Sequence, residues 1–144
     1  MEIHTHAYVR RVLPHRSPFL LVDRVLELKP QEIKAVKNVT ASEPALAGHF
    51  PEEPLFPAVL LLEGLVQTAG LLLAQEGQEG KRLGYLASVA QARFRRPVQP
   101  GDQLIYEVWM LRAHSGFYRF AGRALVGSEI AAEAEFTIAL PGVQ

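Results

Sequence analysis

The chain has 144 residues, of which 49% are hydrophobic and 21% charged, and its 15 basic residues balance its 15 acidic residues. This length predicts a single domain over residues 1–144, and the zero net charge gives no reason to expect a nucleic acid or a membrane as partner. The absence of cysteine excludes disulfides, a thiol nucleophile and thiolate metal ligands.

The first forty residues combine a polar start with two predicted strands. The opening segment, MEIHTHAYVRRVLPHR, lacks the apolar core of a secretory signal, so the expected compartment is the cytoplasm. His4 and His6 could bind a metal as an H-x-H pair, but a pair near a frayed chain end is not a usual ligand set, and we expect no metal. The segments 18–28 and 33–39 are rich in large apolar and β-branched residues, which predicts strands.

A long apolar helix is predicted over residues 57–74. Pro57 suits its first turn, because the N–H that proline lacks would be unpaired there anyway. The run approaches the length of a membrane span, but it contains Glu63, Gln67 and two glycines, so we interpret it as a buried core helix. Glycine and charged residues over 76–84 predict the loop that ends it.

Four more strands are predicted after the helix, over residues 85–94, 102–113, 116–126 and 130–140. A helix that is apolar almost all round must be covered on most sides. The expected fold is therefore α+β, with a strongly curved antiparallel sheet wrapped around one long helix.

The last two strands are predicted to form a hairpin of defined register. In the final strand the even positions are apolar and the odd positions carry glutamates, while the preceding strand has Arg119 and Arg123 at odd positions. The two charged faces coincide only if odd residues pair with odd residues. A three-residue loop over 127–129 that pairs Val126 with Ile130 meets this condition, and we predict that register.

Three residues around the predicted helix start form a candidate site. His49 precedes Pro57 by eight residues, Glu63 follows it by six, and Gln67 lies one turn beyond on the same helix face. A neutral histidine can take a proton from carbon next to a carbonyl, a carboxyl group in apolar surroundings can give one to a leaving hydroxyl, and helix-end amides can hold an oxyanion. The same spacing also fits a hydrogen-bonded loop histidine and a narrow polar stripe on a buried helix.

Three quoted segments bear a resemblance to a known family: LPHRSPFLLVDRV, GHFPEEPLFPAVLLLEGLVQ and ARFRRPVQPGDQL. They resemble the signature segments of the bacterial 3-hydroxyacyl-[acyl-carrier-protein] dehydratases of the FabZ type, in the same order and at the same separation. The resemblance implies a hot-dog fold, a long central helix wrapped by a curved antiparallel sheet. It also implies dehydration of a (3R)-hydroxyacyl group on acyl carrier protein to the trans-2-enoyl group in fatty-acid biosynthesis, without a cofactor.

The resemblance also implies which residues do the chemistry. His49 would be the general base or acid at the α-carbon of the thioester, and Glu63 would handle the β-hydroxyl and the departing water. In this family the two come from different subunits, so a homodimer would be the smallest complete unit and a hexamer of three dimers is a further possibility. The other implied substrate-binding residues are Ala58, whose backbone amide would polarise the thioester carbonyl; Leu55, whose carbonyl would fix the His49 ring; Gln67, which would support Glu63; and Phe50.

Three arginines near the start of the third segment admit two interpretations. Arg93, Arg95 and Arg96 would ordinarily be a solvated strand edge, or they could help to dock the acidic acyl carrier protein and the phosphate of its 4'-phosphopantetheine arm. The carrier could also be coenzyme A.

Three positions depart from the family pattern. Ala58 stands where glycine is usual, Gly64 where alanine is usual, and Ser17 where tyrosine is usual near the tunnel mouth. We expect Gly64 to return some of the room that the Ala58 methyl takes, and the chain-length preference stays open. Two alternatives also stay open: a hot-dog acyl thioesterase, and a non-catalytic acyl-thioester-binding homologue in which Ala58 blocks productive placement.

Overall fold

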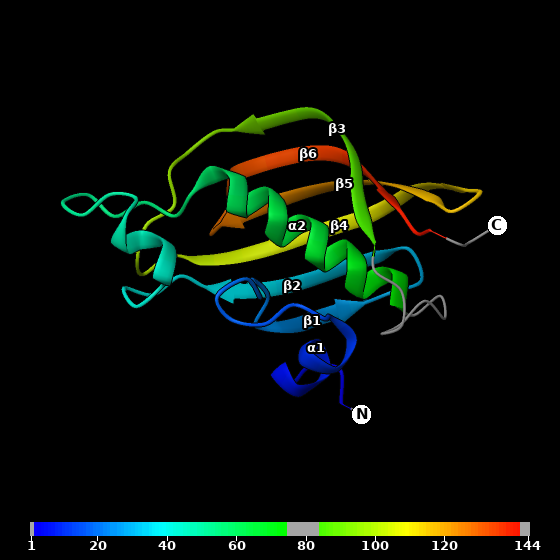
Figure 1. Ribbon diagram of the computed structural model, residues 1–144, viewed down its shortest axis with the longest axis horizontal. Coiled ribbons are helices and arrows are strands. Elements are labelled where there is room, and N and C mark those ends of the chain that lie inside the picture. Colours follow the sequence, from blue (N-terminus) through cyan, green and yellow to red (C-terminus); the bar gives the residue numbers. More distant parts are fainter. Residues whose placement is uncertain (1, 75–83, 142–144) are drawn as a thin grey trace.

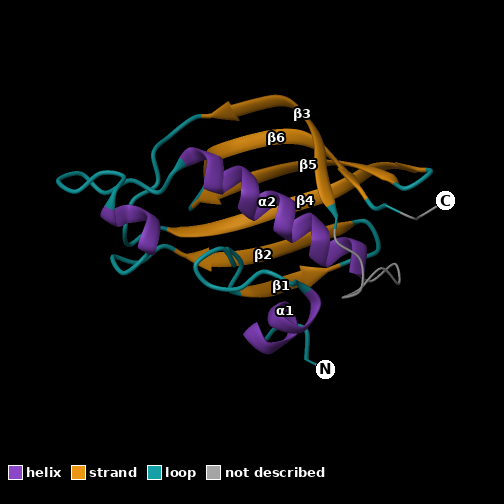
Figure 2. Ribbon diagram, in the orientation of Figure 1, coloured by secondary structure: helices purple, strands orange, loops and turns teal. Residues whose placement is uncertain are grey.

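The computed structural model describes residues 2–74 and 84–141. Its elements, in chain order, are α1 (His6–Val12), β1 (Arg24–Leu28), β2 (Glu32–Asn38), the 3-10 helix η1 (Pro44–Ala47), α2 (Ala58–Leu73), β3 (Tyr85–Phe94), β4 (Gln103–His114), β5 (Phe117–Val126) and β6 (Glu129–Ala139). The strands form one antiparallel sheet in the order β1-β2-β4-β5-β6-β3. α2 lies across one face of this curved sheet (Figure 1, Figure 2), which confirms the predicted α+β arrangement.

The hydrophobic core lies between α2 and the face of the sheet that it covers. Three aromatic side chains from neighbouring strands, Tyr106, Phe120 and Phe136, are fully or almost fully buried there. Burial of such large apolar surfaces is the main favourable term in packing a helix on a sheet. Among the described helices, none is both long and apolar enough to span a membrane. The loop predicted over 76–84 lies, except for Gly84, outside the described residues.

α2 approaches the sheet very closely at Gly64. A Cβ atom at this position would overlap the hydroxyl oxygen of Tyr106 on β4 and would lie 2.8 Å from Cε1 of the same ring. The buried Tyr106 hydroxyl donates a 3.1 Å hydrogen bond to the carbonyl of Leu21, which fixes the ring in place. The Tyr106 ring therefore fills the space that a side chain at position 64 would occupy. Gly64 does not give a substrate the room taken by the Ala58 methyl, so that expectation from the sequence was wrong.

Gly64→Ala is expected to lower the melting temperature of the protein. Overpacking a core costs about 1–3 kcal/mol, which exceeds the roughly 1 kcal/mol by which alanine is better than glycine inside a helix. Gly70→Ala in the same helix is the matched control, because among the described residues its Cβ would approach only the Leu13 side chain, at 3.3 Å. Thermal unfolding of both variants makes the comparison. A Gly64→Ala protein as stable as Gly70→Ala would show that the Tyr106 ring can move aside at little cost.

The β5–β6 hairpin differs from the predicted register. Val126 pairs with Glu129 and not with Ile130, so the loop has two residues and the three-residue prediction was wrong. A bulge follows directly, where one strand contributes an extra residue, and it restores the pairing of odd with odd residues. Arg123 consequently lies opposite Glu133, so the charged faces coincide as expected, although by a different route.

The short helix α1 was not predicted from the sequence. Thr5 caps it by accepting a backbone hydrogen bond, and Val9 and Val12 bury its inner face. The rings of His4 and His6 lie 2.9 and 2.7 Å from backbone carbonyls in and next to β1. The H-x-H pair therefore ties the N-terminal segment to the sheet. The described residues contain no group of three or more His, Asp or Glu side chains that could hold a metal ion.

Candidate active site

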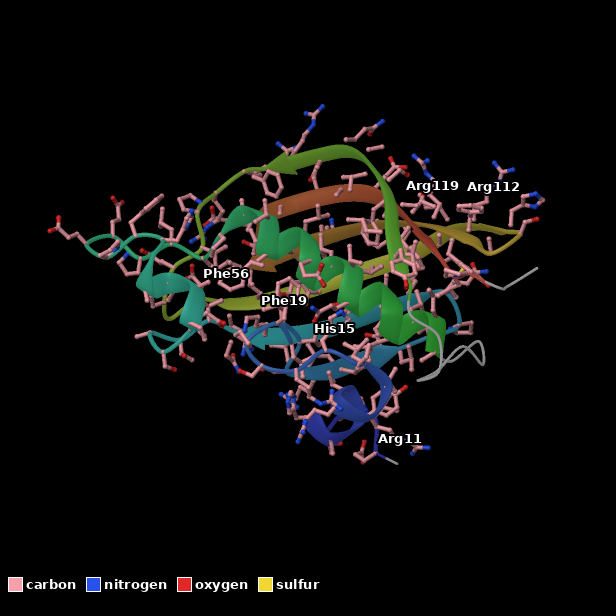
Figure 3. The ribbon with its side chains drawn as sticks, viewed as in Figure 1. Arg11, His15, Phe19, Phe56, Arg112 and Arg119 are labelled. Atoms are coloured by element: carbon pink, nitrogen blue, oxygen red, sulfur yellow. The ribbon has the colours of Figure 1, made fainter. Side chains whose placement is uncertain are left out.

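His49 lies on a protruding loop between η1 and α2. The loop is anchored at Leu46 and Phe56, which are 4% and 3% exposed, whereas most residues between them are exposed. Figure 3 labels Phe56 near the start of α2. The Leu55 N–H donates a 2.8 Å hydrogen bond to the His49 carbonyl and closes the loop on itself. The position of His49 is therefore set by local turns and by the two buried anchors.

The His49 ring is held in one tautomer. Its Nδ1 lies 2.9 Å from the carbonyl oxygen of Leu55, which is the contact implied by the resemblance. Because a carbonyl only accepts, Nδ1 carries the proton, and Nε2 of the neutral ring keeps a lone pair. The ring stacks on Phe50 with centroids 4.2 Å apart, and Phe50 is itself 51% exposed. His49 thus presents a basic nitrogen beside an accessible aromatic surface.

The start of α2 supplies a backbone amide that the helix itself leaves unpaired. The helix begins at Ala58, and Pro57 is its N-cap residue and not part of its first turn. Because the first residues of a helix have no acceptor four positions earlier, the Ala58 N–H has no partner within α2. Ala58 and Val59 are both exposed. This end of the helix is suited to an oxygen that develops negative charge.

Glu63 is oriented by Gln67, as the resemblance implied. Nε2 of Gln67 donates a 2.9 Å hydrogen bond to Oε2 of Glu63. The same amide donates to the Phe19 carbonyl, at 2.7 Å, and accepts from the Leu21 N–H, at 2.9 Å. Gln67 is only 1% exposed, so it is a fixed bridge between Glu63 and the segment before β1. These side-chain bonds satisfy backbone groups that strand pairing would use, and the first strand accordingly begins only at Arg24.

His15 is a second side chain beside Glu63, and the sequence analysis did not identify it as a site residue. Its Nε2 lies 3.7 Å from Oε2 of Glu63, with the two side chains 32% and 24% exposed. Its Nδ1 is buried and has no hydrogen-bond partner among the described residues. Since a neutral ring has one N–H, this arrangement fits a proton on Nε2 that points toward Glu63. Figure 3 shows His15 beside α2; its place within LPHRSPFLLVDRV was the signal that could have found it.

His15 should make the stability of the fold depend on pH. Burial lowers the pKa of His15 from its usual 6.5, the carboxylate of Glu63 acts in the opposite direction, and Arg16 lowers it further. The unfolded chain therefore binds a proton more readily than the folded chain. The neutral His15 ring therefore contributes fully to the free energy of unfolding above the pKa that His15 has in the unfolded chain. This contribution is lost as the pH falls from there through the lower pKa of the folded protein.

His15→Gln removes this titration. The melting temperature of the wild type minus that of the variant should therefore be larger at about pH 8 than at about pH 5.5. Thermal unfolding of both proteins at the two pH values measures the difference. If the melting temperatures of the two proteins fall by the same amount between these pH values, protonation of His15 does not contribute to the pH dependence of stability.

His49 and Glu63 do not meet within one chain. In the part of the chain that the structure describes, neither a hydrogen bond nor an ion pair joins them: His49 bonds to Leu55, and Glu63 contacts Gln67 and His15. One chain therefore presents an oriented base and an oriented carboxylate as separate halves of a candidate site.

The three arginines near the end of β3 differ in their partners. Arg95 forms a 2.9 Å ion pair with Glu133, and Arg96 lies 3.4 Å from Asp102. Over residues 2–74 and 84–141, Arg93 forms no close ion pair, although it lies opposite Glu133 in the sheet and its charge acts on that carboxylate. An ion-paired arginine has less charge to offer a partner protein, so Arg93 is the most available of the three.

Solved structures with this architecture identify the class of fold. The dehydratase heterocomplex ApeI:P from Xenorhabdus doucetiae is similar with a TM-score of 0.79 at 20% identity, covering 93% of this chain and 91% of that chain. A hypothetical thioesterase with coenzyme A from Streptococcus pneumoniae gives a TM-score of 0.66 at 11% identity, covering 84% and 87%. At these identities the likeness shows the fold alone, and it is the hot-dog fold expected from the sequence.

Sequence comparison defines the family. Residues 13–135 match the FabA-like domain. The 3-hydroxyacyl-[acyl-carrier-protein] dehydratase FabZ of Polynucleobacter asymbioticus is 51% identical over 133 residues, covering 92% of this chain and 89% of that protein. The protein of the same name from Paracidovorax citrulli is 50% identical over 139 residues, covering 94% and 93%. The chain therefore belongs to the FabZ-type dehydratase family.

Proposed function

We propose that this protein is a lyase that dehydrates (3R)-hydroxyacyl groups on acyl carrier protein to trans-2-enoyl groups in fatty-acid biosynthesis, as a single hot-dog domain over residues 1–144. The proposal depends on one observation, the presence of a tautomer-fixed His49 and an oriented Glu63 in a chain 51% identical to a protein named as such a dehydratase. In this reaction the C–H bond at the α-carbon and the C–O bond at the β-carbon break, a double bond forms between the two carbons, and one water leaves.

The two side chains divide the proton transfers. The Nε2 lone pair of His49 takes the α-proton, while the Ala58 N–H at the positive end of α2 holds the charge that develops on the thioester oxygen. The β-hydroxyl takes a proton from the Glu63 carboxyl and leaves as water, and exchange with solvent then restores both groups. The remaining residues support this pair: Leu55 keeps the proton on Nδ1 of His49, Gln67 holds the Glu63 carboxyl, and Phe50 offers an apolar wall to the acyl chain.

A complete site requires a second subunit. Leu86, Val89 and Phe94 on β3 pair with β6 residues that point into the core, so they face the α2 side of the sheet. They are nevertheless 43%, 41% and 47% exposed, and β3 is an edge strand. An apolar edge strand is a surface for another chain. Pairing of two β3 strands would cover it, and we take the resulting homodimer, alone or as three dimers in a hexamer, to be the active unit.

Acyl carrier protein with its 4'-phosphopantetheine arm is the proposed partner. The names of the relatives support this partner, and the available charge of Arg93 suits an acidic protein and a phosphate. Arg95 and Arg96 have a smaller part in docking here, because their ion pairs must first be exchanged. No nucleic acid, membrane, metal or cofactor is part of the proposal, and the cytoplasm stays the predicted compartment.

Mass spectrometry of the carrier protein tests the reaction class. Incubation with 3-hydroxyacyl carrier protein should give a species lighter by one water that still holds its acyl chain. Loss of the whole acyl group would instead support a thioesterase. An unchanged thioester with the wild type, but turnover with Ala58→Gly, would support a binding homologue whose oxyanion site is blocked by the Ala58 methyl. The same acyl group on coenzyme A, run in parallel, shows how far turnover depends on the carrier protein.

A further inference from the structure

A buried charge that the proposed reaction does not use contacts the residue before η1 and the last part of the His49 loop. Lys37 belongs to β2 and is 5% exposed. Its Nζ lies 2.7 Å from Oε1 of Glu43, whose side chain is 10% exposed, just before η1. The same Nζ lies 5.7 Å from the centroid of the Phe56 ring, within the range of a cation–π interaction. One ammonium group therefore holds the segment before His49 and the segment after it.

Short chains of hydrogen bonds connect both contacts to His49. On one side the Leu46 N–H donates to the Glu43 carbonyl, at 3.0 Å, and the His49 N–H donates to the Leu46 carbonyl, at 3.2 Å. On the other side Leu55, which bonds to His49 through its N–H and its carbonyl, at 2.8 and 2.9 Å, directly precedes Phe56. Glu43 and the residue before Phe56 are therefore each connected to His49 through two hydrogen bonds.

Stability alone gives little reason for this buried ion pair. The cost of removing two charges from water offsets most of their attraction, and well-packed apolar residues in their place often give equal or greater stability. What apolar residues cannot reproduce is a directional contact that fixes the relative position of three segments. Residues 50–54, in the middle of the loop, are exposed and give His49 no support from the core.

We propose that Lys37 is a positioning residue for His49. Through its contacts with Glu43 and Phe56, Lys37 fixes the loop relative to the sheet. In that position Nε2 of His49 can reach the α-carbon of the substrate. This inference rests on the proposed dehydration for its effect on turnover, while its effect on the loop is independent of the reaction.

A double variant, Lys37→Met/Glu43→Leu, tests this role. It removes both charges together, so no unpaired charge stays buried and folding should persist. Lys34→Met is the matched control on the same strand. Its Nζ lies 3.4 Å from Glu107, but the side chain is 48% exposed, and Glu107 keeps a 2.6 Å contact with Arg123.

Hydrogen exchange and turnover report on the two parts of the proposal separately. In the double variant we expect amide exchange over residues 43–56 to be about tenfold faster, with the rest of the protein and Lys34→Met unchanged. We expect kcat to fall about tenfold or more, with KM within about twofold, because a small displacement of a catalytic group acts on the chemical step. Lys37→Arg, which keeps the cation, should recover most of the kcat.

Two results would overturn the proposal. Unchanged exchange over 43–56 in the folded double variant would show that Lys37 does not hold the loop. Faster exchange with wild-type kcat would show that holding the loop does not position His49. If the double variant does not fold, Glu43→Asp shortens the side chain while keeping its charge, so that no unpaired charge is left buried, and unchanged exchange and kcat there would contradict the proposal equally. A wild type without turnover would count against the proposed function. The exchange data would still show whether Lys37 holds the loop.

Discussion

His49→Ala is expected to lower the kcat of enoyl formation by about a hundredfold to ten-thousandfold, the usual contribution of a positioned acid or base. The structure gives the reason: the ring is fixed by Leu55 so that the free Nε2 is its only basic atom. Glu63→Gln should act in the same range, because it keeps the size of the side chain but removes the proton that the hydroxyl needs. Absorbance of the conjugated enoyl thioester measures both rates.

The control for these variants is another histidine. His114→Gln, at the exposed end of β4, should leave kcat unchanged. Thermal unfolding and the oligomeric state must match the wild type for each protein, so that a loss of rate cannot come from a loss of structure. A folded His49→Ala protein that keeps more than about a tenth of the wild-type kcat would remove His49 from the proposed mechanism.

Mixing two inactive variants should restore activity if each site takes His49 from one subunit and Glu63 from the other. In a heterodimer of His49→Ala and Glu63→Gln subunits, one site loses both groups and the other keeps both. Random pairing at equal amounts makes half of the dimers mixed, so about a quarter of the wild-type sites return. The structural reason to expect this is that, in the described part of one chain, no hydrogen bond or ion pair joins the two side chains, which contact other residues.

The measurement is turnover after the two variants are unfolded together and refolded, or are co-expressed. Separately refolded variants, mixed afterwards without exchange of subunits, are the control and should stay inactive. If the co-refolded mixture is also inactive while it contains mixed dimers, the two residues act within one subunit, and the proposed interface through β3 is wrong.

The sequence predicted the parts of the site that depend on local spacing. One helix turn separates Glu63 from Gln67, and a helix of any context brings such residues together. The contact between His49 and Leu55 was implied by the resemblance. It is local as well, since backbone hydrogen bonds within the short loop bring the two residues together. The helix itself could be predicted because its apolar run is too long to be anything but a core element in a chain of this composition.

Contacts between distant segments could not be predicted in the same way. His15 reaches Glu63, and Tyr106 fills the space at Gly64, only because the fold brings separate segments together. The β5–β6 bulge was not predicted. A bulge changes which residues lie opposite each other, but it leaves no mark in the composition of either strand. Lys37 looked like an ordinary strand lysine, since nothing in a single sequence shows that its partner Glu43 is buried beside it.

The central claim, that this chain removes water from 3-hydroxyacyl groups on acyl carrier protein, is tested most directly by following enoyl absorbance with the wild-type oligomer and a 3-hydroxyacyl carrier-protein substrate. We expect absorbance to rise with enzyme concentration until the hydration equilibrium is reached, with the acyl chain still attached to its carrier. No rise with a folded oligomer across several chain lengths, or a rise in free thiol in its place, would contradict the claim.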